Sequence, residues 1–397
     1  MTIVPKGYSF GVAAAGFKRP DRNDLGIIVS SGEASAAGVF TTNRFQAAPV
    51  LVCRELLGGR PLARALLVNS GQANACTGAE GLANCRETLK IAAKAAKGFN
   101  IDARDVLPTS TGVIGAQLKM DKWAAAAPQL AASLGKATAM DVAKAMMTTD
   151  TFPKLSAKTI ALPGGEVRVL GMCKGAGMIS PKMATMLGFV ITDADVEPTD
   201  WQQILSFAAD RSFNALTVDG DTSTNDTVLA LANGASRVAA RDAKSIRLLR
   251  DCVTRICQEL SYRIVQDAEG GTKVAHIAVT GARSNAQAEL AARAIGNSPL
   301  VKTALFGCDP NWGRIVAALG RSGADFDPEA VVLRIGGILV FEKGQPAPED
   351  LDALLAPIMR HQDVEIALDL GGGRGSFTLL ASDLTKRYIE INADYRT

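Results

Sequence analysis

Hydrophobic and polar positions follow two periods along this chain, that of buried strands and that of amphipathic helices. Short apolar runs predict strands at 65–70, 167–172, 187–192, 227–232 and 274–280. Apolar residues spaced three and four apart predict helices near 79–97, 200–210, 242–260 and 285–295. Thr199 is the expected N-cap of the second helix. This mixture of strands and helices predicts an α/β sandwich in which sheets and helices form layers.

Further strand patterns occupy the C-terminal part of the chain, at 331–341, 364–370, 376–382 and 387–392. The glycine-rich stretch GGGRG (371–375) separates two of them. Glycines let backbone N–H groups approach a phosphate, but this stretch lacks the Lys-Ser/Thr of a P-loop and the spacing of a dinucleotide-binding turn. A tight β-hairpin is the preferred interpretation.

Composition and charge narrow the class of protein. The chain has 397 residues, of which 47% are hydrophobic, so it suits a large core and more than one lobe. Its 43 Lys and Arg residues against 40 Asp and Glu give a net charge of only +3, and 5% of residues are aromatic, which argues against a nucleic-acid partner. No apolar run reaches membrane-spanning length, so we expect no membrane partner.

The cysteines and histidines exclude several kinds of site. The seven cysteines are scattered and never spaced CxxC, and the start MTIVPKGYSFG has no signal-peptide core, so we expect reduced thiols and a cytoplasmic protein. With His276 and His361 as the only histidines and no HExxH motif, we expect no metal site. We also expect both histidines to be structural or surface residues.

Four polar stretches are candidates for chemistry. TSTG (109–112) is expected to be a short polar loop, and a plain turn is its preferred interpretation. Its small residues would also let backbone amides point into a cavity, as an oxyanion hole needs. MTTDTFPK (147–154) resembles a helix end before a proline. DGDTSTNDT (219–227) forms either a turn or part of a polar site. DAEGGTK (267–273) places Glu269 beside glycines, either aimed into a site or as a solvated loop charge.

The stretch KGAGMISPKMATMLG (174–188) places Thr185 among residues of apolar, core-like character. A threonine hydroxyl is a poor nucleophile unless a base takes its proton. If the chain breaks before Thr185, the freed α-amine becomes that base, with a pKa near ~8. The hydroxyl could make the break itself by attacking the carbonyl of Ala184, which gives an ester that water hydrolyses. A strand start is the plain interpretation of an isolated Ala-Thr step.

Neighbouring motifs change that interpretation. They are AGVFTTNRFQAAPV (37–50), LVNSGQANACTG (67–78), STGVIG (110–115), MTTDTFPK (147–154), KGAGMISPKMATML (174–187), FNALTVDGDTSTNDT (213–227), GCDPNWGRI (307–315) and INADYRT (391–397). With them the sequence resembles the ornithine acetyltransferase family, also called glutamate N-acetyltransferase, along essentially the whole chain. One mild departure is Ala268, where members often carry glycine.

The resemblance implies a layered α/β fold of the N-terminal-nucleophile type that cleaves itself between Ala184 and Thr185. The products would be an alpha chain, 1–184, and a beta chain, 185–397, which fold together as one unit. Two copies of each chain would assemble into a heterotetramer.

The resemblance also implies residue roles. Thr185 is the nucleophile, and Thr111 and Gly112 stabilise the oxyanion. The positions that bind substrate together with Thr185 are Thr148, Lys174, Glu269, Asn392 and Thr397. Lys174 suits a substrate carboxylate and Glu269 suits an amine. We expect DGDTSTNDT to support this site from behind.

The implied reaction belongs to arginine biosynthesis. Acetyl moves from N2-acetyl-L-ornithine to Thr185 and then to L-glutamate in a ping-pong sequence, with acetyl-CoA as a second donor in bifunctional members and with no metal or organic cofactor. A related N-terminal-nucleophile aminopeptidase or amidase would hydrolyse instead of transferring. A non-enzymatic module that binds a phosphate-bearing ligand is a more distant alternative.

Overall fold

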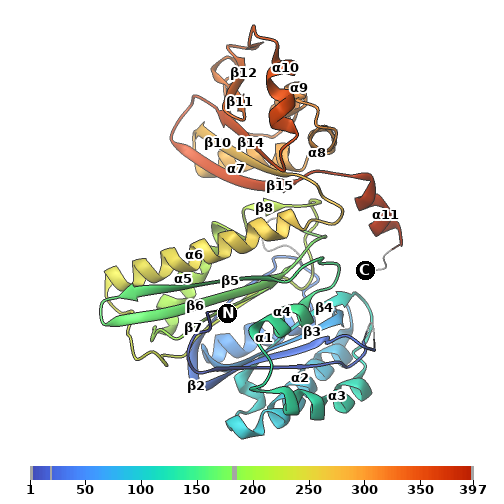
Figure 1. The fold of residues 1–397 in the computed structure, drawn as a ribbon, viewed down its shortest axis with the longest axis vertical. Coiled ribbons are helices and arrows are strands. Elements are labelled where there is room, and N and C mark those ends of the chain that lie inside the picture. Colours follow the sequence, from blue (N-terminus) through green and yellow to red (C-terminus); the bar gives the residue numbers. More distant parts are fainter. Residues whose placement is uncertain (1–2, 18–19, 181–185, 395–397) are drawn as a thin grey trace.

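The chain folds into two stacked lobes, each built around a β-sheet (Figure 1). The computed structural model describes residues 3–17, 20–180 and 186–394. Helix α11 (Lys386–Asp394) follows the second lobe and lies beside the junction of the two. The layered α/β architecture predicted from the sequence is confirmed.

The first lobe contains a sheet with the strand order β4-β3-β2-β9-β7-β6-β5, and β1 pairs with β2 beside this path. Its strands are β1 (Tyr8–Ala13), β2 (Leu25–Phe40), β3 (Leu62–Gln72), β4 (Val106–Val113), β5 (Lys154–Leu162), β6 (Gly165–Lys174), β7 (Leu187–Thr192) and β9 (Thr227–Ala232). Its helices are α1 (Ala48–Gly59), α2 (Gly78–Ala95), α3 (Met120–Ser133), α4 (Ala139–Met146), α5 (Pro198–Asp210) and α6 (Ala243–Gln266), with 3₁₀ turns at Lys97–Phe99 and Ala103–Asp105.

Long strand β2 connects two halves of this sheet. Its first part pairs with β1 and β3, its last part pairs with β9, and its register with β3 shifts between Val29 and Ala34. One core lies between the halves and contains Leu66 from β3 and Phe189 from β7. Helices α2 and α3 pack outside one half, and α5 and α6 pack outside the other (Figure 1). The layers therefore follow the order helix, sheet, sheet, helix.

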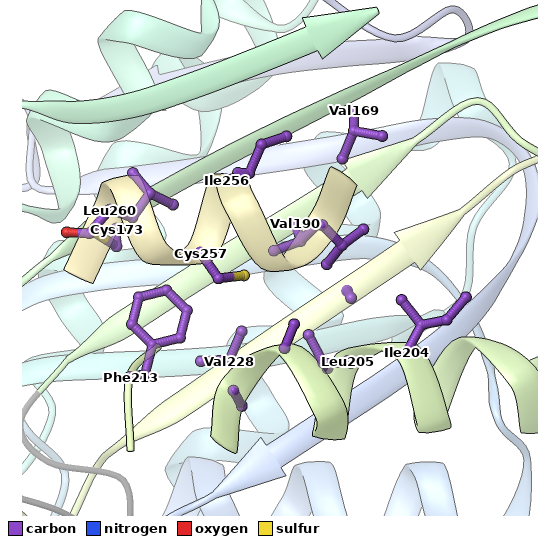
Figure 2. Packing of buried hydrophobic residues seen from close by; sticks show 14 of the residues in the cluster. Val169, Cys173, Val190, Ile204, Leu205, Phe213, Val228, Ile256, Cys257 and Leu260 are labelled. Atoms are coloured by element: carbon purple, nitrogen blue, oxygen red, sulfur yellow. The ribbon is translucent and has the colours of Figure 1, made fainter. Parts of the chain in front are cut away.

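Strand β7 is apolar throughout, and both of its faces are buried. Leu187 and Phe189 face the core between the sheet halves, whereas Val190 faces the core under α5 and α6. Figure 2 shows this second core, with Ile256 of α6 and Leu205 of α5 beside Val190. A strand buried on both faces has no polar side to alternate with.

The second lobe has the strand order β13-β12-β11-β14-β10-β15-β8. Its strands are β8 (Leu216–Thr217), β10 (Val274–Ala282), β11 (Val332–Ile335), β12 (Ile338–Glu342), β13 (Gln345–Pro346), β14 (Asp363–Asp369) and β15 (Gly375–Ser382). Its helices are α7 (Asn285–Gly296), α8 (Pro299–Phe306), α9 (Trp312–Gly320) and α10 (Leu351–Met359), with a 3₁₀ turn at Pro328–Ala330. Strand β8 precedes β9 in the chain but pairs with β15, so it joins the lobes.

Several sequence predictions about the elements are wrong. GGGRG is not a hairpin turn, because β10 lies between β14 and β15 and pairs with both. The predicted strand 331–341 is two strands, since Gly336 and Gly337 turn the chain with φ of 55° and 82°. Residues 387–392 lie in helix α11 and not in a strand. Helix α5 begins at Pro198, so Thr199 is inside the helix and Glu197 holds the N-cap position.

Within residues 3–17, 20–180 and 186–394, no helix combines the length and the apolar character needed to cross a membrane.

Candidate active site

A cavity of about 200 Å³ lies where the first lobe meets α11. One water molecule needs roughly 10–15 Å³, so this space accommodates a ligand of several heavy atoms. The cavity brings together residues from distant parts of the sequence, from Ala73 to Asn392. The predicted site residues that line it are Thr111, Gly112, Thr148, Lys174, Glu269 and Asn392.

Thr111 and Gly112 lie at the end of β4, so the prediction of a loop at TSTG is wrong. They pair in parallel with Ser70 and Gly71 of β3. Gly112 has a φ of +132°, and a Cβ at this position would approach the carbonyl carbon of Gly71 to 2.2 Å. Only glycine fits both the conformation and this close approach. The strand pairing holds Thr111 rigidly at the cavity wall.

Lys174 ends strand β6 and is buried. Its Nζ lies 3.3 Å from Oγ1 of Thr111. Burial lowers the pKa of Lys174, while the nearby carboxylates of Asp150 and Asp226 act in the opposite direction. Lys174 is thus a poorly hydrated cation at the cavity wall, which suits it to pair with an anionic ligand group.

Thr148 follows the end of α4, in agreement with the predicted helix end at MTTDTFPK. Its backbone N–H donates to Oδ2 of Asp150 over 3.0 Å. The same carboxylate accepts the N–H of Gly175 over 2.7 Å. Asp150 therefore holds Thr148 and Gly175, the residue that follows Lys174, in fixed positions relative to each other.

Glu269 meets the C-terminal helix at the opposite side of the cavity. Nδ2 of Asn392 donates to Oε2 of Glu269 over 2.8 Å, and the Glu269 N–H donates to the carbonyl of Ala176 over 3.0 Å. A Cβ on Gly177 would lie 2.4 Å from the Glu269 carboxylate, so this glycine makes room for the side chain. Glu269 is aimed at the cavity rather than being a plain surface charge.

The polar loop before β9 also reaches the cavity, which corrects the expectation that it only supports the site from behind. Its lining members are Asp219, Asp221, Ser223 and Asn225. Asp219 accepts the backbone N–H groups of Met178 and Ile179 over 2.6 and 2.7 Å. It also accepts the phenolic O–H of Tyr388, over 3.2 Å. Sequence reasoning missed Tyr388 because one tyrosine in an expected strand carries no signal.

Ala184, Thr185 and Thr397 lie outside the described residues. On the C-terminal side of 181–185, the N–H of Met186 donates to Oδ1 of Asp226 over 3.0 Å. Asp226 is fully buried, and this burial raises the pKa of its carboxyl well above the usual range. The histidines are not part of the lining: His276 lies on β10 and contacts Asp363 over 2.7 Å.

Comparison with known proteins decides the family. The model of the ArgJ family matches residues 9–397. The chain belongs to the ArgJ family. This confirms the resemblance inferred from the motifs.

Curated members of the ArgJ family match over the full length. The chain is 55% identical to the arginine biosynthesis bifunctional protein ArgJ of Nitratidesulfovibrio vulgaris over 397 residues, which covers 100% of both chains. It is 44% identical to the ArgJ protein of Geobacter sulfurreducens, with 99% of each chain covered.

A solved ArgJ structure from Bacillus halodurans is 35% identical, with a TM-score of 0.50, and the match covers 52% of this chain and 98% of that one. A structure of ornithine acetyltransferase from Mycobacterium tuberculosis complexed with ornithine is 37% identical, with a TM-score of 0.41 and 45% and 93% of the chains covered.

Proposed function

We propose that this protein is an acetyltransferase of arginine biosynthesis that moves acetyl from N2-acetyl-L-ornithine to L-glutamate, with acetyl-CoA as a second donor. The observation that carries the proposal is the meeting of Thr111, Gly112, Lys174, Glu269 and Asn392 around one small cavity. Full-length relatives named as arginine biosynthesis bifunctional proteins support both activities. The reaction takes place in the cytoplasm, which agrees with seven cysteines that are all free thiols.

The reaction has two half-reactions at the hydroxyl of Thr185. In the first, this oxygen bonds to the acetyl carbon, the amide C–N bond breaks, and the hydroxyl proton passes to the leaving ornithine amine. In the second, the glutamate amine bonds to the acetyl carbon of the ester, the C–O bond to Thr185 breaks, and a proton from that amine passes to the Thr185 oxygen. The α-amine of Thr185 carries the proton, since a terminal amine titrates near ~8 and serves as a base at neutral pH.

The charges around the cavity suit amino-acid substrates. Lys174 pairs with the substrate α-carboxylate, and Glu269 pairs with the ornithine side-chain amine. Thr111 and Gly112 donate to the oxygen that becomes negative when the acetyl carbon is attacked. Thr148, Asn392 and Thr397 complete the contacts to the substrate.

Self-cleavage between Ala184 and Thr185 exposes the nucleophile and divides the protein into chains 1–184 and 185–397. A solved family chain that is matched over 98% of its length by 52% of this chain supports such a division near the middle. Two copies of each chain form the active heterotetramer.

The proposal is tested with purified protein in three assays. Intact mass should give fragments 1–184 and 185–397, and glutamate should be acetylated with either acetyl-ornithine or acetyl-CoA as donor. Thr185→Ala should stay uncut and inactive. Active wild-type protein that is wholly uncut would overturn the mechanism, and steady amide hydrolysis without an acceptor would identify an amidase instead.

A further inference from the structure

A buried cluster of charges lies behind the cavity, and the roles proposed above do not use it. Lys154, the first residue of β5, is fully buried. Its Nζ lies 2.8 Å from Oδ1 of Asp150 and 2.5 Å from Oδ2 of Asp267. Both carboxylate side chains are buried as well, with exposures of 0% and 2%. Buried charges are costly unless they are paired and hydrogen-bonded, so one cation here holds two anions in place.

Each carboxylate also holds a segment of the site. Asp150 accepts the N–H groups of Thr148 and Gly175, and Gly175 directly follows Lys174. Asp267 accepts the N–H of Thr151 over 3.0 Å and also its hydroxyl. Two residues after Asp267 the chain reaches Glu269. Lys154 thus connects three segments of the cavity wall, 148–151, 174–175 and 267–269.

We propose that Lys154 is a positioning residue for acetyl transfer, which holds the carboxylates of Asp150 and Asp267 in place and thereby fixes Thr148, Lys174 and the Glu269 segment around the cavity. It does not line the cavity, and it acts through its two partners. This inference rests on the proposed function.

The charged groups around Asp150 determine its pKa, so loss of Lys154 should have an effect that depends on pH. The titratable groups around this cluster come from several elements. They are Lys154, Lys174, Cys173, Asp267, Asp226 and Glu269, with Arg263 near Cys173 and with Arg22 and Asp24 beside Asp150 in a second cavity. Burial alone would raise the pKa of Asp150, but Lys154 and Lys174 hold it at about 2. Without Lys154, the charge of Lys174 and the hydrogen bond from the Gly175 N–H still oppose burial, but the charge and hydrogen bond of Lys154 are lost, so the pKa of Asp150 rises. Protonation then removes one acceptor oxygen from the backbone of Thr148 and Gly175.

Lys154→Met removes the charge and keeps the length of the side chain. We expect kcat to fall by about tenfold to a hundredfold, because small misplacements of a reacting constellation have effects of this size. KM should change less. The ratio of variant to wild-type kcat should fall further as the pH is lowered from about 8 to about 5, since Asp150 becomes protonated. Lys158→Met is the matched control: this lysine is on the same strand and pairs with Glu259 over 2.6 Å, away from the cavity.

The double variant Lys154→Met/Asp150→Asn removes Lys154 together with one of its two partners, so that Asp267 is the one carboxylate of the cluster that loses its cation, which limits the folding defect. It should stay slow, but its kcat ratio to wild type should depend less on pH than that of Lys154→Met, because residue 150 no longer titrates. A Lys154→Met enzyme with wild-type kcat and pH profile overturns the inference, whatever its melting temperature. If that variant does not fold, wild-type kcat in the double variant overturns it equally. A wild-type protein without acetyl transfer would instead overturn the function on which the inference rests.

Discussion

At the scale of single residues, the orientation of the Thr111 hydroxyl is set by its hydrogen bond with Lys174. Nζ of Lys174 donates to Oγ1 of Thr111 over 3.3 Å. Because an ammonium has donors only, this oxygen accepts, and its own proton is directed elsewhere. A donor fixed before charge develops is what stabilises an oxyanion.

Replacing Thr111 by Val removes this donor while keeping the shape of the side chain. We expect kcat to fall by about a hundredfold to a thousandfold, with a smaller change in KM, since the contact strengthens in the transition state. Thr111→Ser keeps the hydroxyl and should retain most activity. Steady-state kinetics distinguish these outcomes, and a normal kcat with a raised KM would assign Thr111 to ground-state binding.

The burial of Lys302 is expected to make the stability of the protein depend on pH. This residue of α8 is buried, and its Nζ donates to the carbonyl of Ser382 over 2.5 Å. Burial lowers the pKa of Lys302 to about 8, although Asp219 and Asp383 oppose this shift. Between about pH 8 and about pH 10.4 the unfolded chain therefore binds more protons at this residue than the folded protein does, so this group makes stability rise with pH.

Lys302 should raise the free energy of unfolding by roughly 3 kcal/mol across this pH range, because its pKa is shifted by about two units and each unit corresponds to about 1.4 kcal/mol. In the Lys302→Met variant, the free energy of unfolding should not show this increase with pH. Urea-unfolding free energies of the Thr185→Ala single chain, with and without Lys302→Met, measure the difference across this pH range. Parallel curves for the two proteins would show that Lys302 is an ordinary lysine.

At the scale of elements, α11 completes the cavity from the C-terminal end of the chain. Tyr388 and Asn392 are four residues apart and thus share one face of the helix. Their side chains reach Asp219 and Glu269. Thr385, just before the helix, donates to the carbonyl of Gly270 over 2.8 Å and anchors the start of this segment. Chain ends are usually frayed, so these contacts indicate a task for the helix.

Truncation after Thr385 should therefore impair acetyl transfer far more than folding. We expect a loss of at least about a hundredfold in kcat/KM, comparable with the loss of an essential positioning group. Self-cleavage should survive, because it uses Thr185 and the carbonyl before it. Asn392→Ala removes the contact to Glu269 and the hydrogen bond to the carbonyl of Tyr388, and deletion of 395–397 removes Thr397. Each change should cause part of the loss in kcat/KM. Full transfer activity in the truncated protein would assign α11 to the ordinary surface.

At the scale of the whole molecule, the proposed cleavage point does not coincide with the boundary of the lobes. Strands β7 and β9, from the proposed chain 185–397, lie between β2 and β6 of the proposed chain 1–184. They pair with these neighbours over their full lengths. The two chains would share one sheet and the cores on both of its faces.

The fragments should consequently stay together after cleavage. We expect one peak in native size-exclusion chromatography that contains both fragments, and separation only in denaturant. Refolding of either fragment alone should fail, since β7 and β9 would lack their partners and expose buried apolar faces. A fragment that folds alone with a cooperative melting transition would contradict this.

The sequence by itself determined most of the local elements and indicated which residues line the cavity. The strand at 187–192 could be predicted without knowing its neighbours, because a continuous apolar run indicates a strand buried on both faces. The helix at 243–266 could be predicted in the same way, because apolar residues spaced three and four apart indicate a helix buried on one side. The resemblance carried by the motifs also indicated six residues that the structure brings to one cavity, namely Thr111, Gly112, Thr148, Lys174, Glu269 and Asn392.

Only the tertiary structure decided which elements are neighbours. Strand β10 separates β14 and β15 because pairing between strands depends on contacts distant in sequence, which local patterns do not encode. Residues 387–392 have the alternation of a strand, yet they form a helix whose polar face meets Asp219 and Glu269. Lys154 has the sequence signature of a surface lysine, and its burial follows from carboxylates 4 and 113 residues away. Long-range pairing of charges and strands, rather than local preference, assembled the cavity.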